Sequence, residues 1–177
     1  MSPQAAADPG PRARRVNAVI LATLVVAVLI TTLAWALDGV PHDYVSLAVL
    51  TVLTLGTRVV RVRVVERVAV AASGIVSLAS CVLVGPVGSA LMMATTILLE
   101  RGAAGWRARL FNASMGAILG SVGGLTYLLA GGPADLTTIS GPGELMVRVG
   151  GPFLVASLVF SLVNFASIAM IVRLDGG

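Results

Sequence analysis

Six apolar runs, separated by short charged stretches, most constrain how this chain folds. The runs cover about Val16–Leu37, Tyr44–Val60, Val68–Val84, Val87–Leu99, Leu110–Ala130 and Pro152–Val172. Hydrophobic residues make up 57% of the 177 residues and charged residues 11%, whereas soluble domains average roughly 45–50% and about 25%. A soluble core of this size cannot bury so much apolar surface. We therefore expect an all-α, polytopic membrane bundle of about six transmembrane helices.

The arginines give this bundle an orientation. All twelve basic residues are Arg, and only Arg148 lies outside the stretches that would share one side of a six-span bundle. The opposite side would carry four acids, Asp38, Asp43, Asp135 and Glu144. Positively charged loops tend to stay in the cytoplasm, so both termini are predicted to be cytoplasmic. The Ala, Val and Gly content without any Lys indicates a GC-rich coding sequence, and with it a bacterial plasma membrane.

The boundaries between segments follow from proline, glycine and charge. Residues 1–15 contain three prolines and are predicted to form a disordered cytoplasmic tail, residues 16–173 the transmembrane domain, and residues 174–177 a cytoplasmic end. The 22-residue first run exceeds the apolar region of a signal peptide, which favours a retained helix. Residues 101–109 and 131–151 are predicted loops. The stretch 58–70 fits an extended segment as well as a helix.

The third and fourth runs are short for full crossings of the bilayer. They can form one membrane hairpin or two tilted or partial spans, and removing both together leaves the termini on the same side. The charge distribution thus supports an even number of crossings without fixing it at six.

One face of the fifth run is built from glycine. Gly116, Gly120 and Gly124 recur at every fourth residue, with Gly123 beside them. This spacing lets a second helix approach closely, because no side chain separates the backbones. It predicts packing within the bundle, with dimerisation as the alternative.

Two runs carry polar stripes that are candidate ligand contacts. The sixth contains Ser157, Ser161, Asn164 and Ser167, and the third contains Ser73, Ser77 and Ser80. Lipid offers no hydrogen-bond partner, so these faces are expected to point inward. They would either line a small polar cavity, with Asn164 as the leading ligand contact, or form hydrogen bonds between helices. The second alternative is favoured.

The chemistry that the sequence lacks argues against an enzyme or an ion-coupled carrier. His42, flanked by Asp38 and Asp43, is the only histidine, and we expect it to lie in a solvated turn rather than in a metal site. Cys81 is the only cysteine, so an intramolecular disulfide is excluded. Charged residues are absent from the middle of the confident spans, and nucleophile, phosphate-loop and zinc motifs are missing. We predict no catalytic residue, no cofactor, no metal and no nucleic-acid partner.

The region from Val68 to Gly177 resembles a known type of membrane module. An apolar run closes with LVGPVGSAL, a short span and an Arg/Trp loop follow, Leu110-Phe111-Asn112-Ala113 opens a Gly/Ala-rich helix, and Val163-Asn164 lies in the last span. This arrangement resembles the N-terminal membrane region of bacterial, actinobacterial-type signalling proteins that precedes HD-type phosphohydrolase, GAF or GGDEF domains. None of those output motifs occurs here, so the resemblance supplies no catalytic residue.

The expected function is that of a non-catalytic sensory or anchoring domain of a bacterial signalling protein. Its partners would be the lipid bilayer and either a second copy of the chain or a cytoplasmic or membrane signalling protein. The alternative is a small-solute binding or transport subunit whose pocket is formed by Ser73, Ser77, Ser161, Asn164 and Ser167.

Overall fold

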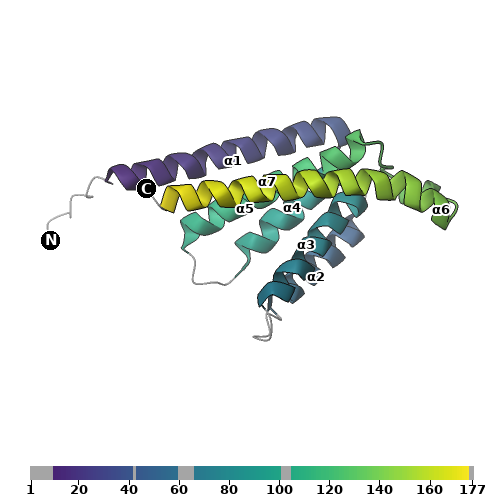
Figure 1. The fold of residues 1–177 in the computed structure, drawn as a ribbon, viewed down its shortest axis with the longest axis horizontal. Coiled ribbons are helices and arrows are strands. Elements are labelled where there is room, and N and C mark those ends of the chain that lie inside the picture. The colour runs from purple at the N-terminus through teal and green to yellow at the C-terminus, as the bar shows by residue number, and fades with distance from the viewer. Residues whose placement is uncertain (1–9, 42, 60–65, 101–104, 176–177) are drawn as a thin grey trace.

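The described part of the chain consists of helices and the turns between them (Figure 1). The computed structural model describes residues 10–41, 43–59, 66–100 and 105–175, and within them places the side chains of 14–41, 43–57, 74–100 and 105–169. The elements are α1 (Pro11–Asp38), α2 (Tyr44–Val59), α3 (Glu66–Leu83), α4 (Gly85–Leu98), α5 (Trp106–Leu129), the 3₁₀ turn η1 (Leu136–Thr138), α6 (Pro142–Leu145), the π turn η2 (Met146–Gly150) and α7 (Gly151–Asp175). No strand occurs in these ranges, so the all-α prediction is confirmed there.

Helices begin earlier than predicted at two places. The predicted disordered tail is wrong for Pro11–Arg15, which form the first turn of α1. Proline suits the first turn of a helix because its φ is already helical and its missing N–H would have had no partner there. The predicted loop 101–109 is wrong at its end, since Trp106–Arg109 open α5. Within the ambiguous stretch 58–70, Glu66 begins α3.

The predicted loop 131–151 is largely helical from Pro142 onward. The segment Pro142–Ala169 runs as one helical stretch that contains the π turn η2. Pro152 lies just beyond η2, and its ring would conflict with the carbonyl of Arg148 in a regular α-helix. A widened turn at this place removes that conflict. The sixth apolar helix therefore extends well beyond its predicted start at Pro152.

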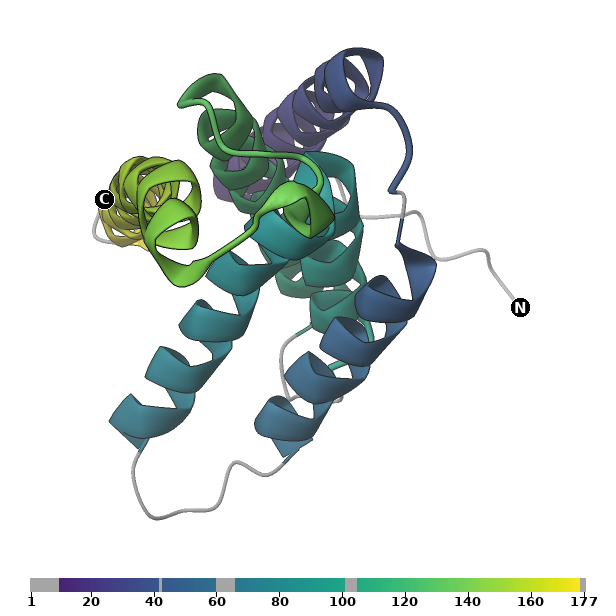
Figure 2. The same cartoon turned by 90° about the vertical axis from the view of Figure 1, so that its right-hand side faces the viewer.

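Helix α5 lies at the centre of the fold, where it contacts α1, α3, α4 and α7. Helices α1, α5 and α7 run lengthwise beside one another, whereas α2 and α3 form a hairpin inclined away from them (Figures 1 and 2). The start of α1 and the end of α7 lie at the same end of the fold in Figure 1. This arrangement places the starts of α1 and α5 and the end of α7 together.

Two described helical segments are both long and apolar enough to cross a membrane. They are Arg14–Asp38 and Pro142–Ala169, and only 17% and 22% of their most apolar windows are buried within the fold. The core helix of a soluble protein would instead be mostly buried. Two such helices are fewer than the six crossings predicted from the sequence.

Candidate functional site

The glycine face of α5 lies against α4. A Cβ built on Gly120 would lie 2.6 Å from the backbone nitrogen of Ala90, and one on Gly124 would lie 2.4 Å from the Cα of Pro86. At Gly116 the nearest atom would be Cδ1 of Ile97, at 2.8 Å. The two helices therefore meet backbone to backbone, and the face predicted from Gly116, Gly120 and Gly124 packs inside the fold.

Serine and threonine hydroxyls connect the helices around this contact. The Ser80 and Ser89 hydroxyls pair at 2.7 Å between α3 and α4, and Thr31 pairs with Ser121 at 3.0 Å between α1 and α5. Ser80, Ser89 and Ser121 have no exposed surface. Small residues allow the close approach, and their hydroxyls then satisfy one another.

The predicted ligand-binding stripe on the sixth helix does not face the interior. Ser161 and Asn164 are exposed on α7, and the Ser167 hydroxyl donates to the carbonyl of Val163 at 2.6 Å. Helix α7 instead turns Ala156 and Phe160 toward the core.

A physical reason for this orientation lies in the shape of α5. The ring of Phe160 lies 3.3 Å from the position of a Cβ built on Gly123, so this glycine leaves room for it. Burying an aromatic ring against a close-packed surface gains more contact than turning a serine inward, and a serine can bond its own helix backbone. The inward expectation for Ser161 and Asn164 is therefore wrong.

The two other members of the proposed polar pocket belong to α3. Ser77 is buried within α3, and the side chain of Ser73 lies outside the described residues. None of the cavities described between these helices is lined by Ser77, Ser161, Asn164 or Ser167.

A cavity of about 460 Å³ lies at the opposite end of the fold from the starts of α1 and α5. We call it the outer pocket. Its floor is the α3–α4 turn at Cys81–Gly85, and its walls come from the α1–α2 connection, the end of α5 and the segment before η1. Its polar lining includes Asp38, Asp43, Ser46, Tyr127, Asp135 and Thr137.

The shortness of α4 creates this pocket. Helix α4 begins at Gly85 opposite Gly124, whereas α5 continues to Leu129, five residues further. At 1.5 Å per residue, α5 extends about 7 Å beyond the α3–α4 turn. The connecting segments close over part of that space. Gly85 adopts φ +70°, and a Cβ there would lie 2.7 Å from Oδ2 of Asp38, so the turn and this carboxyl group are in close contact.

Acidic groups dominate the charge of the outer pocket. The Ser46 hydroxyl donates to Asp43, the Ser46 N–H donates at 2.9 Å, and together they lower the pKa of Asp43. The Thr137 hydroxyl and N–H donate to Asp135 at 2.7 and 2.8 Å and likewise lower its pKa. Both groups are ionised at neutral pH, and no arginine is among the lining residues. The pocket therefore favours cations and hydrogen-bond donors over anions.

His42, the one candidate metal-binding histidine, lies outside the described residues. Its neighbours Asp38 and Asp43 both line the outer pocket. Among the described residues, no three His, Cys, Asp or Glu side chains lie close enough together to hold a metal ion.

The outer pocket was not predicted from the sequence. The one signal that bears on it is the 13-residue fourth run, which is short for a full crossing of the bilayer. Tyr127 and Asp135 were not among the predicted site residues. They come from the end of α5 and the segment before η1, and only the folded chain brings them beside Asp38.

Comparisons with protein families, curated proteins and solved structures found no match to this chain.

Proposed function

We propose that this chain is an integral membrane domain that acts as the sensory or anchoring part of a bacterial signalling protein, without catalytic activity of its own. It would reside in the plasma membrane with both termini in the cytoplasm. One observation carries the proposal: large apolar side chains cover the outside of the described fold, while hydroxyl side chains are among those buried inside it.

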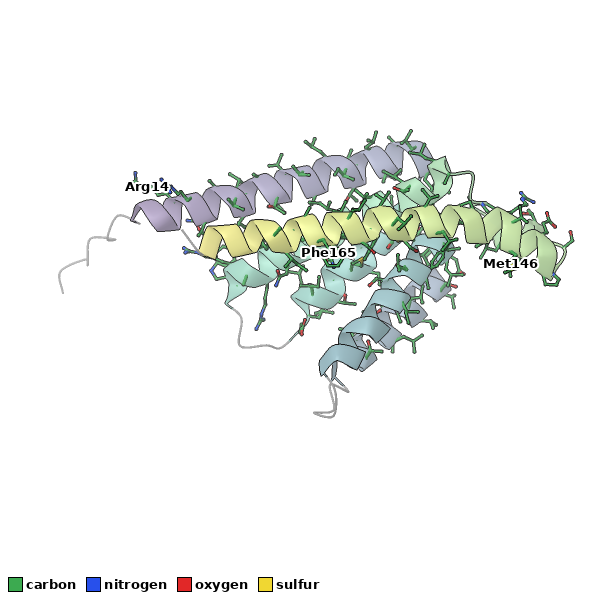
Figure 3. All side chains as sticks on the ribbon, in the orientation of Figure 1. Arg14, Met146 and Phe165 are labelled. Carbon is green, nitrogen blue, oxygen red and sulfur yellow. The ribbon has the colours of Figure 1, made fainter. Side chains whose placement is uncertain are left out.

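A water-soluble domain keeps most of its large apolar side chains inside. Among the described residues, eight serines and threonines are buried within the core, whereas Leu158, Leu162 and Phe165 on α7 are 68–69% exposed. Figure 3 shows side chains projecting outward along α1 and α7, with Phe165 among them. In water such a surface would promote aggregation. Against lipid it needs no further cover, and most of the buried hydroxyls bond the carbonyls of their own helices or, at Ser80 and Ser89, each other.

By length alone, α5 joins α1 and α7 as a helix that could cross the membrane fully. Helices α1, α5 and α7 contain 28, 24 and 25 residues, which correspond to about 42, 36 and 38 Å and exceed a hydrocarbon core of ~30 Å. Helices α2, α3 and α4 contain 16, 18 and 14 residues, or about 24, 27 and 21 Å. We propose that these three are tilted or shorter spans, which preserves the even count.

The ends of the fold support the proposed orientation. Arg14 and Arg15 lie at the start of α1 and Arg107 and Arg109 at the start of α5, the end where α7 finishes. The outer pocket, with its three aspartates, lies at the other end. Arginine at the cytoplasmic end follows the usual bias of membrane proteins.

The sensory role rests on how the outer pocket connects to α7. Asp135 and Thr137 line the pocket and precede the continuous helical stretch that begins at Pro142. That stretch leads through the π turn η2 to Asp175 at the cytoplasmic end. A ligand that binds one arrangement of this segment better than another would shift the position of α7.

Thiol accessibility in intact cells tests the membrane placement. In a Cys81→Ala background, Ser140→Cys should react with a membrane-impermeant reagent, and Ala5→Cys should react only after permeabilisation. Reaction of Ala5→Cys alone in intact cells would reverse the orientation. Five proposed spans, α1 to α5, separate the two positions and place them on opposite sides of the membrane. Reaction of both positions in intact cells would place them on the same side and contradict this arrangement.

A pocket-filling substitution tests the sensory role. Ala134 and Ala130 are both exposed, but only Ala134 is among the residues that line the outer pocket. Nitroxide labels at Arg15→Cys and Ala169→Cys, in the Cys81→Ala background, report the distance between α1 and α7 near the cytoplasmic end. Ala134→Trp should shift this distance, and Ala130→Trp should not. An unchanged distance in both variants would leave α7 as a passive anchor.

A further inference from the structure

Asn164 lies on α7 at a depth where lipid surrounds a membrane-spanning helix. It is sixteen residues after Arg148 and nine before Arg173, or about 24 and 14 Å along the helix. Its side chain is exposed, and the structure gives it no hydrogen bond to the described residues. The side chain is too short to reach the headgroups, unlike the long side chains that extend to the interface.

An amide at this depth needs a partner from outside the chain. A primary amide has both a donor and an acceptor, and leaving them unsatisfied in hydrocarbon is costly. Two copies inserted in the same orientation present Asn164 at the same depth. About a two-fold axis along the membrane normal, each amide can donate to the other, because the group is self-complementary.

The surface that contains Asn164 has the pattern of a helix-pairing face. Alternating spacings of three and four residues separate its members, of which Ser157 is half-buried and the others are exposed: Leu154, Ser157, Ser161, Asn164 and Ile168. This spacing keeps one stripe facing a parallel neighbour along the whole helix. Ser157 and Ser161 are the small residues of this stripe, and Ser161 lies one turn from Asn164, so the backbones can approach there.

We propose that this domain forms a parallel homodimer in the membrane, in which α7 packs against α7 of a second copy and the two Asn164 side chains hydrogen-bond across the two-fold axis. The proposal rests on the proposed membrane placement. The dimer would bring together the cytoplasmic ends of the two α7 helices, each of which follows the outer pocket of its own copy in the chain.

Oxidative cross-linking in native membranes tests the pairing. In a Cys81→Ala background, Ser161→Cys should give a covalent dimer of the chain when a copper–phenanthroline oxidant is added. Ala166→Cys is the matched control, because it is exposed at a similar depth on the opposite side of α7. Equal yields at both positions, or an adduct with a different protein at Ser161→Cys, would overturn the proposal.

Energy transfer between labelled copies in lipid vesicles tests the amide. Asn164→Leu should weaken dimerisation roughly 3- to 20-fold, the effect of one interhelical hydrogen bond in a membrane, whereas Asn164→Gln should retain most of it. Asn112→Leu removes an amide at the start of α5 instead, and it should leave dimerisation unchanged. Equal association of the wild type and Asn164→Leu would refute a role for the amide.

Carbonate extraction of the same membranes separates the two proposals. A chain that stays in the membrane but does not cross-link refutes the dimer and leaves the membrane placement intact. A chain released by carbonate refutes the membrane placement itself, and the dimer with it.

Discussion

Adding a single methyl group at Gly120 should push α4 and α5 apart. A Cβ there would lie 2.6 Å from the backbone nitrogen of Ala90 and 2.6 Å from the carbonyl carbon of Ser89, about 1 Å inside the ~3.5–4.0 Å of an ordinary carbon contact. These neighbours are backbone atoms of a helix and cannot rotate away. Overpacking of this kind costs ~1–3 kcal/mol, while replacing a helical glycine with alanine returns ~0.5–1 kcal/mol. We therefore expect a net loss of about 1–2 kcal/mol for Gly120→Ala.

Gly56 provides the matched control. It lies within α2, and a Cβ built on it would have no atom within 4 Å, so Gly56→Ala should stabilise the protein by about 0.5–1 kcal/mol. Thermal and denaturant unfolding in one detergent would measure both variants. A Gly120→Ala protein as stable as the wild type, or more stable, would show that the α4–α5 contact is looser than these distances imply.

Three further predictions follow from the described residues. In Gly85→Ala, the new Cβ would lie at a φ of +70° and 2.7 Å from the carboxylate of Asp38, whereas in Gly39→Ala it would lie at a φ of +82° with no neighbour within 4 Å. Gly85→Ala should therefore lower the melting temperature more than Gly39→Ala does. Equal decreases in melting temperature would contradict the contact between Gly85 and Asp38. Ser80→Ala and Ser89→Ala should show a coupling of ~0.6 kcal/mol in a double-mutant cycle, because the two hydroxyls bond each other; additive losses would argue against this bond. The hydrogen bonds from Thr137 lower the folded-state pKa of Asp135 below its ordinary value of 3.8, so the stabilisation that they provide is present above pH 3.8 and is lost as pH falls through the lower folded-state pKa. Between about pH 6 and pH 3, the melting temperature should therefore fall more for the wild type than for Asp135→Asn. Parallel curves for the two proteins would contradict this role of Asp135.

Helix positions were predictable because local composition determines them. Each apolar run became a helix, and the glycine spacing in α5 correctly indicated a close contact. The sequence did not name α4 as the partner of Gly120, because a face of glycines accepts any helix whose backbone can reach it. It also missed the helical stretch after Pro142, where the Gly and Pro content predicted a loop and the π turn accommodates Pro152.

The direction in which α7 faces was not predictable from its polar stripe. The stripe indicated an inward face, but the fit of Phe160 against Gly123 turned another face toward α5 and left Asn164 exposed. The outer pocket was beyond reach for a different reason. Asp38, Tyr127 and Asp135 are far apart in sequence, and the length difference between α4 and α5 determines the space that they share.

In the proposed membrane placement, the exposed apolar surface of this fold faces lipid. Nitroxide labels at Leu29 and Leu158, which are 62% and 68% exposed, would test it in proteoliposomes in a Cys81→Ala background, with Ser140→Cys as the control. Molecular oxygen concentrates in the hydrocarbon core, whereas a nickel chelate remains in water. The labels at Leu29 and Leu158 should collide mainly with oxygen, and the label at Ser140 mainly with the chelate. Frequent collisions of the Leu29 and Leu158 labels with the chelate would place this surface in water and contradict the account.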